Sequence, residues 1–299
     1  MTPVAPDPDR ASARSVAGRP LLLGLIGAGI QRSLTPAMHV AEAGHHGIRL
    51  HYQLIDLERT PGSAAELRTL LVAARIMDFA GLNVTYPCKQ AVIPLLDGLS
   101  HEAAAIGAVN TVVIREGRLI GHNTDASGWA WGLRRQLPDA DLGCVVLLGA
   151  GGAGSAVAHA VLALGARRLR VVDTDRARAQ ALAAQLREHH SALVEVCATA
   201  GDALAGATGM IHATPTGMAA HPGMPLPAAL LRPDIWVSEI VYFPHTTELL
   251  RAARALGCRT VDGGGMAVGQ AVGAFELFTG LPPDPERMAR SFRQLIDAR

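Results

Sequence analysis

The chain has almost no net charge and few aromatic residues. Its 299 residues carry 27 basic and 26 acidic side chains, a formal net charge of +1, and aromatic residues make up 4%. A balanced surface does not attract nucleic acid or an anionic membrane, and few aromatic rings leave little for bases to stack on. We therefore expect no nucleic-acid partner and no membrane partner. The composition favours a small-molecule substrate.

Cysteine is also scarce, and no metal-binding spacing is present. The four cysteines lie dozens of residues apart, unlike a zinc ligand set or a redox dithiol. The histidines include no His-x-x-x-His pair with an acidic neighbour, so we expect no metal. Residues 1–20 are rich in proline, alanine and arginine and lack an apolar centre. This excludes an ordinary secretory signal and predicts a flexible leader on a soluble, cytoplasmic protein.

Apolar residues are abundant, which predicts a large core. Hydrophobic residues make up 49% and charged residues 18%. Apolar runs alternate with helical stretches, which predicts an α/β fold with mostly parallel sheets covered on both faces. At this length we expect two domains. We place an N-terminal α/β substrate-binding catalytic domain at residues 21–125 plus 265–299, and a Rossmann-type dinucleotide-binding domain at residues 126–264.

Individual elements can also be predicted from periodicity and from turn residues. Leu21–Ile26 is typical of a buried strand. The pattern then predicts three helices: one with Thr35 as its N-cap, one that covers Ser63–Ile76, and one from Pro87 through Leu96. It also predicts a hairpin of Val109–Ile114 with Leu119–Gly121.

The most specific local pattern is a glycine-rich turn. Gly149-Ala150-Gly151-Gly152-Ala153-Gly154 has the G-x-G-x-x-G spacing, follows an apolar strand and opens an apolar-striped helix. The first glycine permits a tight turn, the second lets pyrophosphate approach the backbone, and the third allows the helix to pack closely on the strand. The free amide groups at the helix start favour a diphosphate. The turn therefore predicts a dinucleotide site.

An acidic residue at the end of the next strand indicates which dinucleotide binds. Asp173 lies 24 positions after Gly149, close to the spacing of a ribose-binding acid. Its carboxylate would accept hydrogen bonds from both ribose hydroxyls and would repel a 2′-phosphate, which favours NAD over NADP. Arg176 and Arg178 leave NADP open, because an arginine nearby can accommodate the phosphate. Asp175 is typical of a helix cap.

Upstream of the turn, Lys89 and Asp125 could move a proton. Oxidation of an alcohol needs a proton acceptor near the hydroxyl while a hydride leaves the carbon, and a lysine amine can be that acceptor. A carboxylate beside it orients the amine and can bind the hydroxyl itself. A surface lysine on a helix and an aspartate that caps a helix would explain the same residues, and spacing alone leaves both interpretations open.

The motifs around these residues resemble those of the shikimate dehydrogenase family, from Leu21 onward and in the family's order. The matching segments are Ser33-Leu34-Thr35-Pro36, Asn83-Val84-Thr85 with Pro87 and Lys89, Gly107-Ala108-Val109-Asn110-Thr111, Gly121-His122-Asn123-Thr124-Asp125, Ala213-Thr214-Pro215, Tyr242 with Pro244, and Asp262-Gly263 with Gln270.

The resemblance implies a cyclohexane polyol carboxylate as substrate and reversible oxidation of its C3 hydroxyl. It implies the following roles: Ser33 and Thr35 on the carboxylate; Thr85, Asn110 and Gln270 on the ring hydroxyls; Lys89 and Asp125 beside the reacting hydroxyl; Tyr242 near the carboxylate and the nicotinamide; and Arg178, Thr214, Pro215 and Gly263 with the glycine turn and Asp173 in the cofactor site. Ser33 and Thr35 as helix caps, and Asn110 and Gln270 as solvated residues, are the ordinary alternatives.

Two departures from the biosynthetic, NADP-linked members set the predicted substrate and cofactor. Asp173-Thr174-Asp175 replaces an Asn-Arg-Thr segment, and Thr35 stands where a second serine is usual. Both changes resemble the NAD-dependent quinate/shikimate dehydrogenases, which act in catabolism. We therefore expect quinate as substrate, with shikimate as the second, in a monomer or homodimer. An NADP-dependent biosynthetic shikimate dehydrogenase, an aminoshikimate or aminoquinate dehydrogenase and a non-catalytic metabolite-sensing relative stay open.

Overall fold

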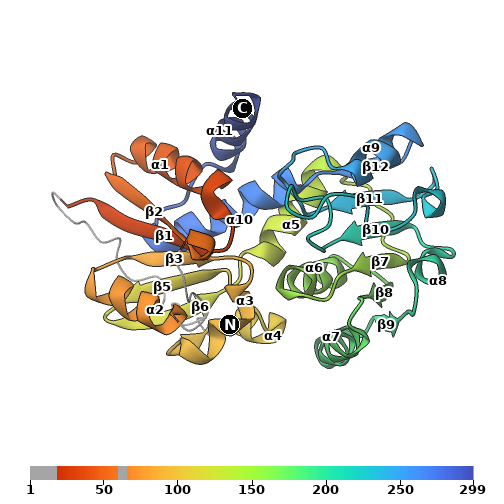
Figure 1. The fold of residues 1–299 in the computed structure, drawn as a ribbon, viewed down its shortest axis with the longest axis horizontal. Coiled ribbons are helices and arrows are strands. Elements are labelled where there is room, and N and C mark those ends of the chain that lie inside the picture. The colour runs from red at the N-terminus through yellow and green to blue at the C-terminus, as the bar shows by residue number, and fades with distance from the viewer. Residues whose placement is uncertain (1–18, 60–65, 299) are drawn as a thin grey trace, which may run out of the picture.

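The computed structural model describes residues 19–59 and 66–298. Two six-stranded sheets lie side by side, each covered by helices, so the predicted two-domain α/β fold is confirmed (Figure 1). The predicted leader falls outside the described residues, apart from its last two positions. In the described residues no helix is both long enough and apolar enough to span a bilayer.

The first sheet is mixed. Its strand order is β2 (Leu50–Asp56), β1 (Leu21–Gly27), β3 (Gly81–Val84), β5 (Thr111–Arg115), β6 (Arg118–His122) and β4 (Gly98–Leu99). Strands β1, β2 and β3 are parallel, whereas β5 is antiparallel to both of its neighbours. The β5–β6 hairpin turns through Glu116 and Gly117, both with positive φ (51° and 74°), as in the tight turns that join antiparallel strands. The predicted hairpin is therefore confirmed.

The second sheet is wholly parallel and Rossmann-type. Its strand order is β12 (Arg259–Val261), β11 (Trp236–Glu239), β10 (Gly209–His212), β7 (Val145–Leu148), β8 (Arg168–Val172) and β9 (Leu193–Val196). Every residue of β7 and β10 is buried, as expected of strands covered on both faces.

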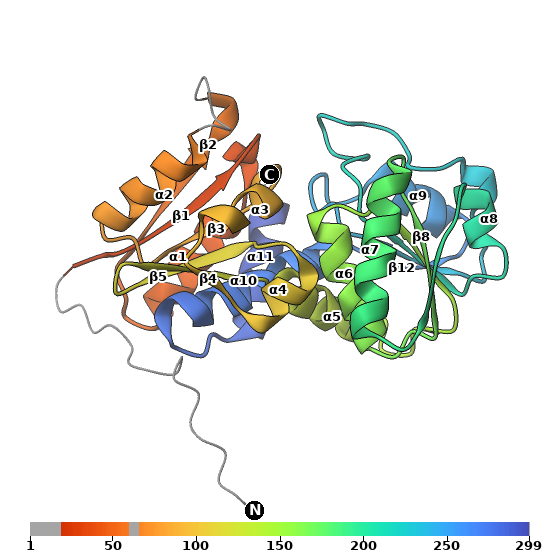
Figure 2. The same ribbon diagram turned by 90° about the horizontal axis from the view of Figure 1, so that it is seen from below.

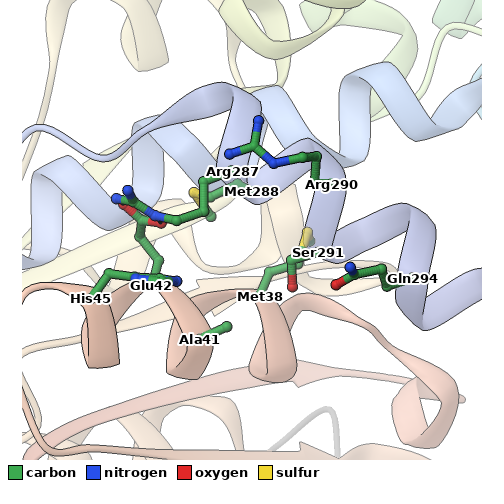
Figure 3. Close-up of a pocket in the computed structure, with 9 residues that line it drawn as sticks. All are labelled: Met38, Ala41, Glu42, His45, Arg287, Met288, Arg290, Ser291 and Gln294. Carbon is green, nitrogen blue, oxygen red and sulfur yellow. Dashed lines mark hydrogen bonds and ion pairs between the residues drawn. The ribbon is translucent and has the colours of Figure 1, made fainter.

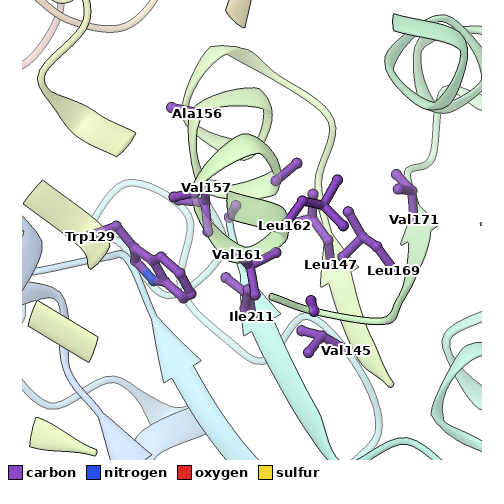
Figure 4. Close-up of a cluster of buried hydrophobic side chains, with 14 of the residues drawn as sticks. Trp129, Val145, Leu147, Ala156, Val157, Val161, Leu162, Leu169, Val171 and Ile211 are labelled. Carbon is purple, nitrogen blue, oxygen red and sulfur yellow. The ribbon is translucent and has the colours of Figure 1, made fainter. Parts of the chain in front are cut away.

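One of the apolar clusters lies beneath α6 (Gly152–Ala163), the helix that follows the glycine turn. Val157 and Val161 of this helix meet Leu147 and Ile211 of the sheet, and Trp129 closes the side of the cluster (Figure 4). Helix α7 (Arg176–His189) lies beside α6, and α4 (His101–Ile106) of the first sheet's half contacts α6 (Figure 2). Two further short helices in this half are α8 (Ala200–Leu204) and α9 (Glu248–Ala255).

Helices α5 (Asp125–Gln136) and α10 (Gly263–Thr279) cross between the two sheets (Figure 1). Glycines line their contact, and a side chain at Gly132 would come within 2.9 Å of the backbone of Gly265. The far end of α10 returns to the first sheet, where Phe278 packs with Leu23 and Val113. Helix α11 (Pro285–Asp297) also returns, as we show below. The division of the chain at residues 125/126 and 264/265 stays a prediction, and its second boundary falls within α10.

Three predicted helix boundaries were wrong or fall partly outside the described residues. The helix expected from Pro87 through Leu96 is only α3 (Cys88–Ala91) followed by a 3-10 turn, because Pro94 lacks the amide that would continue an α-helix. Thr35 is the first residue of α1 (Thr35–His45) and not its N-cap; Leu34 holds the cap position and makes no side-chain cap bond. Helix α2 spans Leu67–Ile76, and positions 63–65 of the predicted helix are not described.

Candidate active site

Lys89 and Asp125 meet at the carboxyl-terminal side of the first sheet. Lys89 Nζ donates to Asp125 Oδ2, and the two side chains are 17% and 5% exposed. Asp125 is the first residue of α5 but does not cap it, because Asn123 Oδ1 accepts from the amides of Asp125 (3.0 Å) and Ala126 (3.4 Å). The Asp125 carboxylate is thereby left to face the amine.

Asn110 holds the second oxygen of that carboxylate. Its Nδ2 donates to Asp125 Oδ1 at 3.0 Å and to Thr124 Oγ1 at 2.9 Å. Its Oδ1 accepts from the Thr124 amide at 2.8 Å and from Thr111 Oγ1 at 3.0 Å. Asn110 is 3% exposed, so the alternative of a solvated polar residue does not describe it.

A chain of hydrogen bonds continues from Asn110 across the strands to Tyr52 on the edge strand β2. Tyr52 Oη donates to Asn83 Oδ1 at 2.6 Å, and Asn83 Nδ2 donates to Thr111 Oγ1 at 3.1 Å. Thr111 then donates to Asn110, which donates to Asp125. Burial raises the pKa of the Tyr52 phenol well above its ordinary value, so the phenol stays a donor. Asn83 and Thr111 belong to motifs that we identified, but we did not include them or Tyr52 among the site residues.

The loop that carries Ser33 is fixed by a buried carboxylate that the sequence analysis did not identify. Asp56, at the end of β2, accepts from Gln31 Nε2 (2.9 Å), the Gly29 amide (3.0 Å) and the Glu58 amide (3.1 Å). Burial alone would raise the pKa of Asp56, but these hydrogen bonds outweigh burial and hold the pKa below its ordinary value.

The other residues expected at the substrate come from three segments of the chain: the loop before α1, the end of β3 and the loop after β11. The Ser33 hydroxyl accepts from the Thr35 amide at 3.3 Å, and the Thr85 amide extends β3 by donating to the Ile26 carbonyl at 2.9 Å. Tyr242 packs in the apolar cluster of Leu34, the residue between Ser33 and Thr35. Tyr242 and the predicted carboxylate-binding loop therefore contribute to one apolar cluster.

Gln270 is placed differently from the rest. Its side-chain Nε2 donates to the Ala267 carbonyl within α10 at 3.0 Å, and its own carbonyl accepts from Thr124 Oγ1 at 3.0 Å. Gln270 is thus tied to the Asn110–Thr124–Asp125 cluster through its backbone, while its side chain bonds along its own helix.

The glycine turn has the shape that a dinucleotide needs. Gly149 has a φ of +102°, a left-handed conformation that favours glycine, and a side chain at Gly154 would collide with the Gly149 carbonyl. A side chain at Gly151 would meet nothing within 4 Å, so the backbone there is open to a ligand. The first turn of α6, which contains Gly152 and Ala153, points its free amides to the same place. These residues fit a dinucleotide diphosphate.

Asp173 ties the turn to the next strand. Its Oδ2 accepts from the Ala150 amide at 2.7 Å and its Oδ1 from the Asp175 amide at 2.8 Å, and the side chain is 7% exposed. Arg178 lies 3.9 Å from Asp173 Oδ1 and 3.5 Å from Asp175 Oδ2. Asp175 Oδ1 also accepts from the Arg178 amide, as the predicted helix cap.

The two halves of the site touch directly. A side chain on Gly152, in the first turn of α6, would come within 3.3 Å of Lys89 Cβ. On the other side of the turn, a side chain on Gly149 would come within 2.7 Å of the Ala213 carbonyl, just before Thr214 and Pro215. Gly263 packs against the Ile240 carbonyl, where a side chain would come within 2.6 Å.

A surface groove between α1 and α11 is separate from this site. Arg287 Nε donates to Glu42 Oε2 at 2.8 Å and anchors α11 on α1 (Figure 3). The groove is lined by Met38, Ala41, Glu42, His45, Arg287, Met288, Arg290, Ser291 and Gln294. None of these is a candidate site residue.

A parallel six-stranded sheet with a glycine-rich turn after its central strand is the architecture of dinucleotide-binding proteins. Residues 25–112 match the family model of the shikimate dehydrogenase substrate binding domain, and residues 263–291 match that of the shikimate 5′-dehydrogenase C-terminal domain.

Three relatives extend the match over nearly the whole chain. The shikimate dehydrogenase (NADP(+)) of Streptomyces avermitilis is 56% identical over 277 residues, which cover 92% of this chain and 95% of that protein. The quinate/shikimate dehydrogenase (NAD(+)) of Corynebacterium glutamicum is 50% identical and covers 92% and 99%. The structure of quinate dehydrogenase from C. glutamicum in complex with NAD matches with a TM-score of 0.84 at 49% identity, again covering 92% and 99%. The chain belongs to the shikimate dehydrogenase family, which confirms the resemblance.

Proposed function

We propose that this protein oxidises the C3 hydroxyl of quinate, and of shikimate as a second substrate, to the corresponding ketone, with NAD as hydride acceptor. The observation that carries the proposal is the buried Lys89–Asp125 pair, set against the first turn of the glycine-turn helix. The relatives with quinate/shikimate and shikimate dehydrogenase names support the substrate class.

The proton step follows from the geometry of the pair. NAD held by the glycine turn would supply the acceptor for the hydride that leaves the carbinol carbon. Lys89 Nζ, starting as an amine, accepts the proton of the substrate hydroxyl. The Asp125 carboxylate stabilises the ammonium that forms. Asn110 keeps Asp125 in place through the bond to Oδ1. In the reverse direction the ammonium returns its proton to the ketone oxygen.

The other substrate contacts of the proposal use side chains around the pair. Ser33 and Thr35, held by the loop that Asp56 fixes, bind the ring carboxylate through their hydroxyls. Thr85 binds a ring hydroxyl, and Tyr242 closes the carboxylate end. Asn110, whose two amide hydrogens are donated to Thr124 and Asp125, reaches a ring hydroxyl only by releasing one of these bonds. Gln270 joins them only after its side chain leaves the Ala267 carbonyl.

The choice of NAD rests on Asp173. Its carboxylate lies at the end of β8 beside the open turn, where a 2′-phosphate would be repelled and a ribose hydroxyl bound. Arg178 is engaged by Asp173 and Asp175 and so is partly neutralised. Relatives of similar identity bear both NAD and NADP names, so this chain's own residues carry the argument.

Initial-rate kinetics with quinate and shikimate, each against NAD and NADP, test the proposal. We expect the highest kcat/KM for quinate with NAD and a measurable rate for shikimate with NAD. A higher kcat/KM with NADP would contradict the cofactor assignment, and turnover only of aminoshikimate or aminoquinate would contradict the substrate. No turnover of any of these would favour the metabolite-sensing alternative.

A further inference from the structure

A buried histidine–glutamate pair joins the two loops at the end of the second sheet. His212 ends β10 and Glu239 ends β11, and the two are register partners in the parallel sheet. His212 Nδ1 lies 2.9 Å from Glu239 Oε1 and 3.1 Å from Oε2, and both side chains are fully buried. A buried carboxylate is costly unless paired, so Nδ1 carries the proton and donates to it.

Each member of the pair holds one loop. His212 Nε2 lies 2.5 Å from the Thr214 hydroxyl, in the loop after β10. Glu239 Oε1 accepts from the Val241 amide at 2.9 Å, in the loop after β11, and Oε2 accepts from the Thr247 hydroxyl at 3.0 Å. The first loop carries Thr214 and Pro215, and the second carries Tyr242.

We propose that His212 and Glu239 are positioning residues that fix the Thr214 loop and the Tyr242 loop relative to each other around the nicotinamide end of the cofactor. The inference rests on the proposed function, because it needs NAD in the glycine turn. Every bond of the pair ends on one of these loops or on the N-cap of α9, so its loss loosens the loops and leaves the glycine turn and Asp173, at the adenosine end, in place.

The pair also orients the Thr214 hydroxyl, which lies 2.5 Å from His212 Nε2. The Thr216 amide, 3.3 Å away, donates to the same hydroxyl and narrows its orientation further. Removal of the imidazole frees the hydroxyl to rotate, so a cofactor amide or hydroxyl group would lose a fixed partner.

Two ligands distinguish the two ends of the cofactor site. NAD occupies both ends, whereas ADP-ribose lacks the nicotinamide, so its affinity reports only on the glycine turn and Asp173. In His212→Asn, the amide keeps a donor for Glu239 but loses the group that faces Thr214. We expect the Kd and KM for NAD to rise about tenfold, because the buried hydrogen bond between His212 and Thr214 is lost. The Kd for ADP-ribose should change by less than about twofold.

Glu239→Gln is the second variant, because it removes the charge without changing the shape. It should show the same split between NAD and ADP-ribose. A double-mutant cycle with Thr214→Val then tests the route: His212→Asn should add little to the loss already caused by Thr214→Val. Glu42→Gln, which removes a buried carboxylate that is paired with Arg287 in the other half, is the matched control and should leave both Kd values unchanged.

The outcomes are distinct. If neither His212→Asn nor Glu239→Gln weakens NAD more than ADP-ribose, or if His212→Asn adds its full loss to that of Thr214→Val, the inference is overturned. A wild-type protein that fails to bind NAD overturns both the inference and the proposed function. A wild-type protein that binds NAD and shows the split in its variants, but turns over neither quinate nor shikimate, contradicts the proposed substrate alone.

Discussion

At the scale of single residues, the bond between Lys89 and Asp125 makes the clearest prediction. Lys89→Ala removes the proton acceptor but touches no cofactor contact, so kcat should fall by about 10²- to 10⁴-fold while the Kd for NAD stays nearly constant. Steady-state kinetics and NAD titration measure the two quantities. A near-normal kcat would show that Lys89 lacks the assigned role, and a parallel loss of NAD binding would indicate a structural role.

Asp173 makes a prediction about cofactor preference that also involves Arg178. Asp173→Asn keeps an oxygen for the Ala150 amide but removes the charge that repels a 2′-phosphate and holds Arg178. The KM for NAD should rise about tenfold and the KM for NADP should fall. If Arg178 is the group that receives the phosphate, adding Arg178→Ala should cancel the gain with NADP. Unchanged KM values for both cofactors would refute the assignment of Asp173.

Tyr52 tests the hydrogen-bond chain behind Asp125. Tyr52→Phe removes the first donor of the chain and leaves Asn83 Oδ1 without that partner. We expect kcat to fall by less than about tenfold, because the lost hydrogen bond is neutral and three further hydrogen bonds separate it from the carboxylate. The KM for NAD should not change. Thr111→Val breaks the same chain closer to Asp125, so the double variant should lose little more than Thr111→Val alone. Additive losses would mean that Tyr52 acts separately.

At the scale of elements, the sequence predicted what periodicity and turn chemistry determine locally. The alternating apolar runs, the hairpin at Glu116-Gly117 and the helix after the glycine turn are confirmed. Short elements such as β4 (Gly98–Leu99) were missed, since two residues carry no period. The helix after Pro87 was predicted too long because apolar residues on both sides of Pro94 continue the pattern, while the missing amide ends the α-helix.

The candidate site shows the same limit. Lys89, Asp125 and Asn110 lie in recognisable motifs, and the structure brings them together. The His212–Glu239 contact depends on the register between β10 and β11, whose partners are 27 positions apart in the chain. A sequence pattern cannot supply that register, because it is set by the packing of the whole sheet.

The α5–α10 crossing makes an element-scale prediction with a control in the same chain. A side chain at Gly128 would collide with the Gln270 amide of α10, whereas one at Gly44, in α1, would meet nothing within 4 Å. Gly128→Ala should lower the free energy of unfolding by about 1–3 kcal/mol, because the helices must separate. Gly44→Ala should raise it by about 0.5–1 kcal/mol, through helix propensity. Urea denaturation measures both, and equal effects of the two variants would contradict the close crossing.

At the scale of the whole molecule, two of the contacts between the halves bear on the site. Helices α5 and α10 form one of them. At the other, Ser155 Oγ of α6 donates to the Ile106 carbonyl at 2.6 Å, and Gln185 Nε2 of α7 donates to the Ala105 carbonyl of α4 at 2.5 Å. Because α6 begins at the glycine turn, this second contact sets the distance between the cofactor helix and Lys89.

His159 of α6 makes the molecule sensitive to acid. Burial, and then the charges of His190 and His189, lower the pKa of His159 to about 4 from the ordinary 6.5. Between pH 6.5 and 4, the folded protein therefore binds fewer protons at His159 than the unfolded chain does. The contribution of neutral His159 to the free energy of unfolding is complete above pH 6.5 and is lost as the pH falls to 4. Full protonation would cost about 3 kcal/mol. In His159→Gln the free energy of unfolding, from urea titrations at pH 7, 6 and 5, should decline less steeply than in the wild type. Parallel declines would mean that other groups, such as the low-pKa carboxyls of Glu42 and Asp56, carry the whole effect.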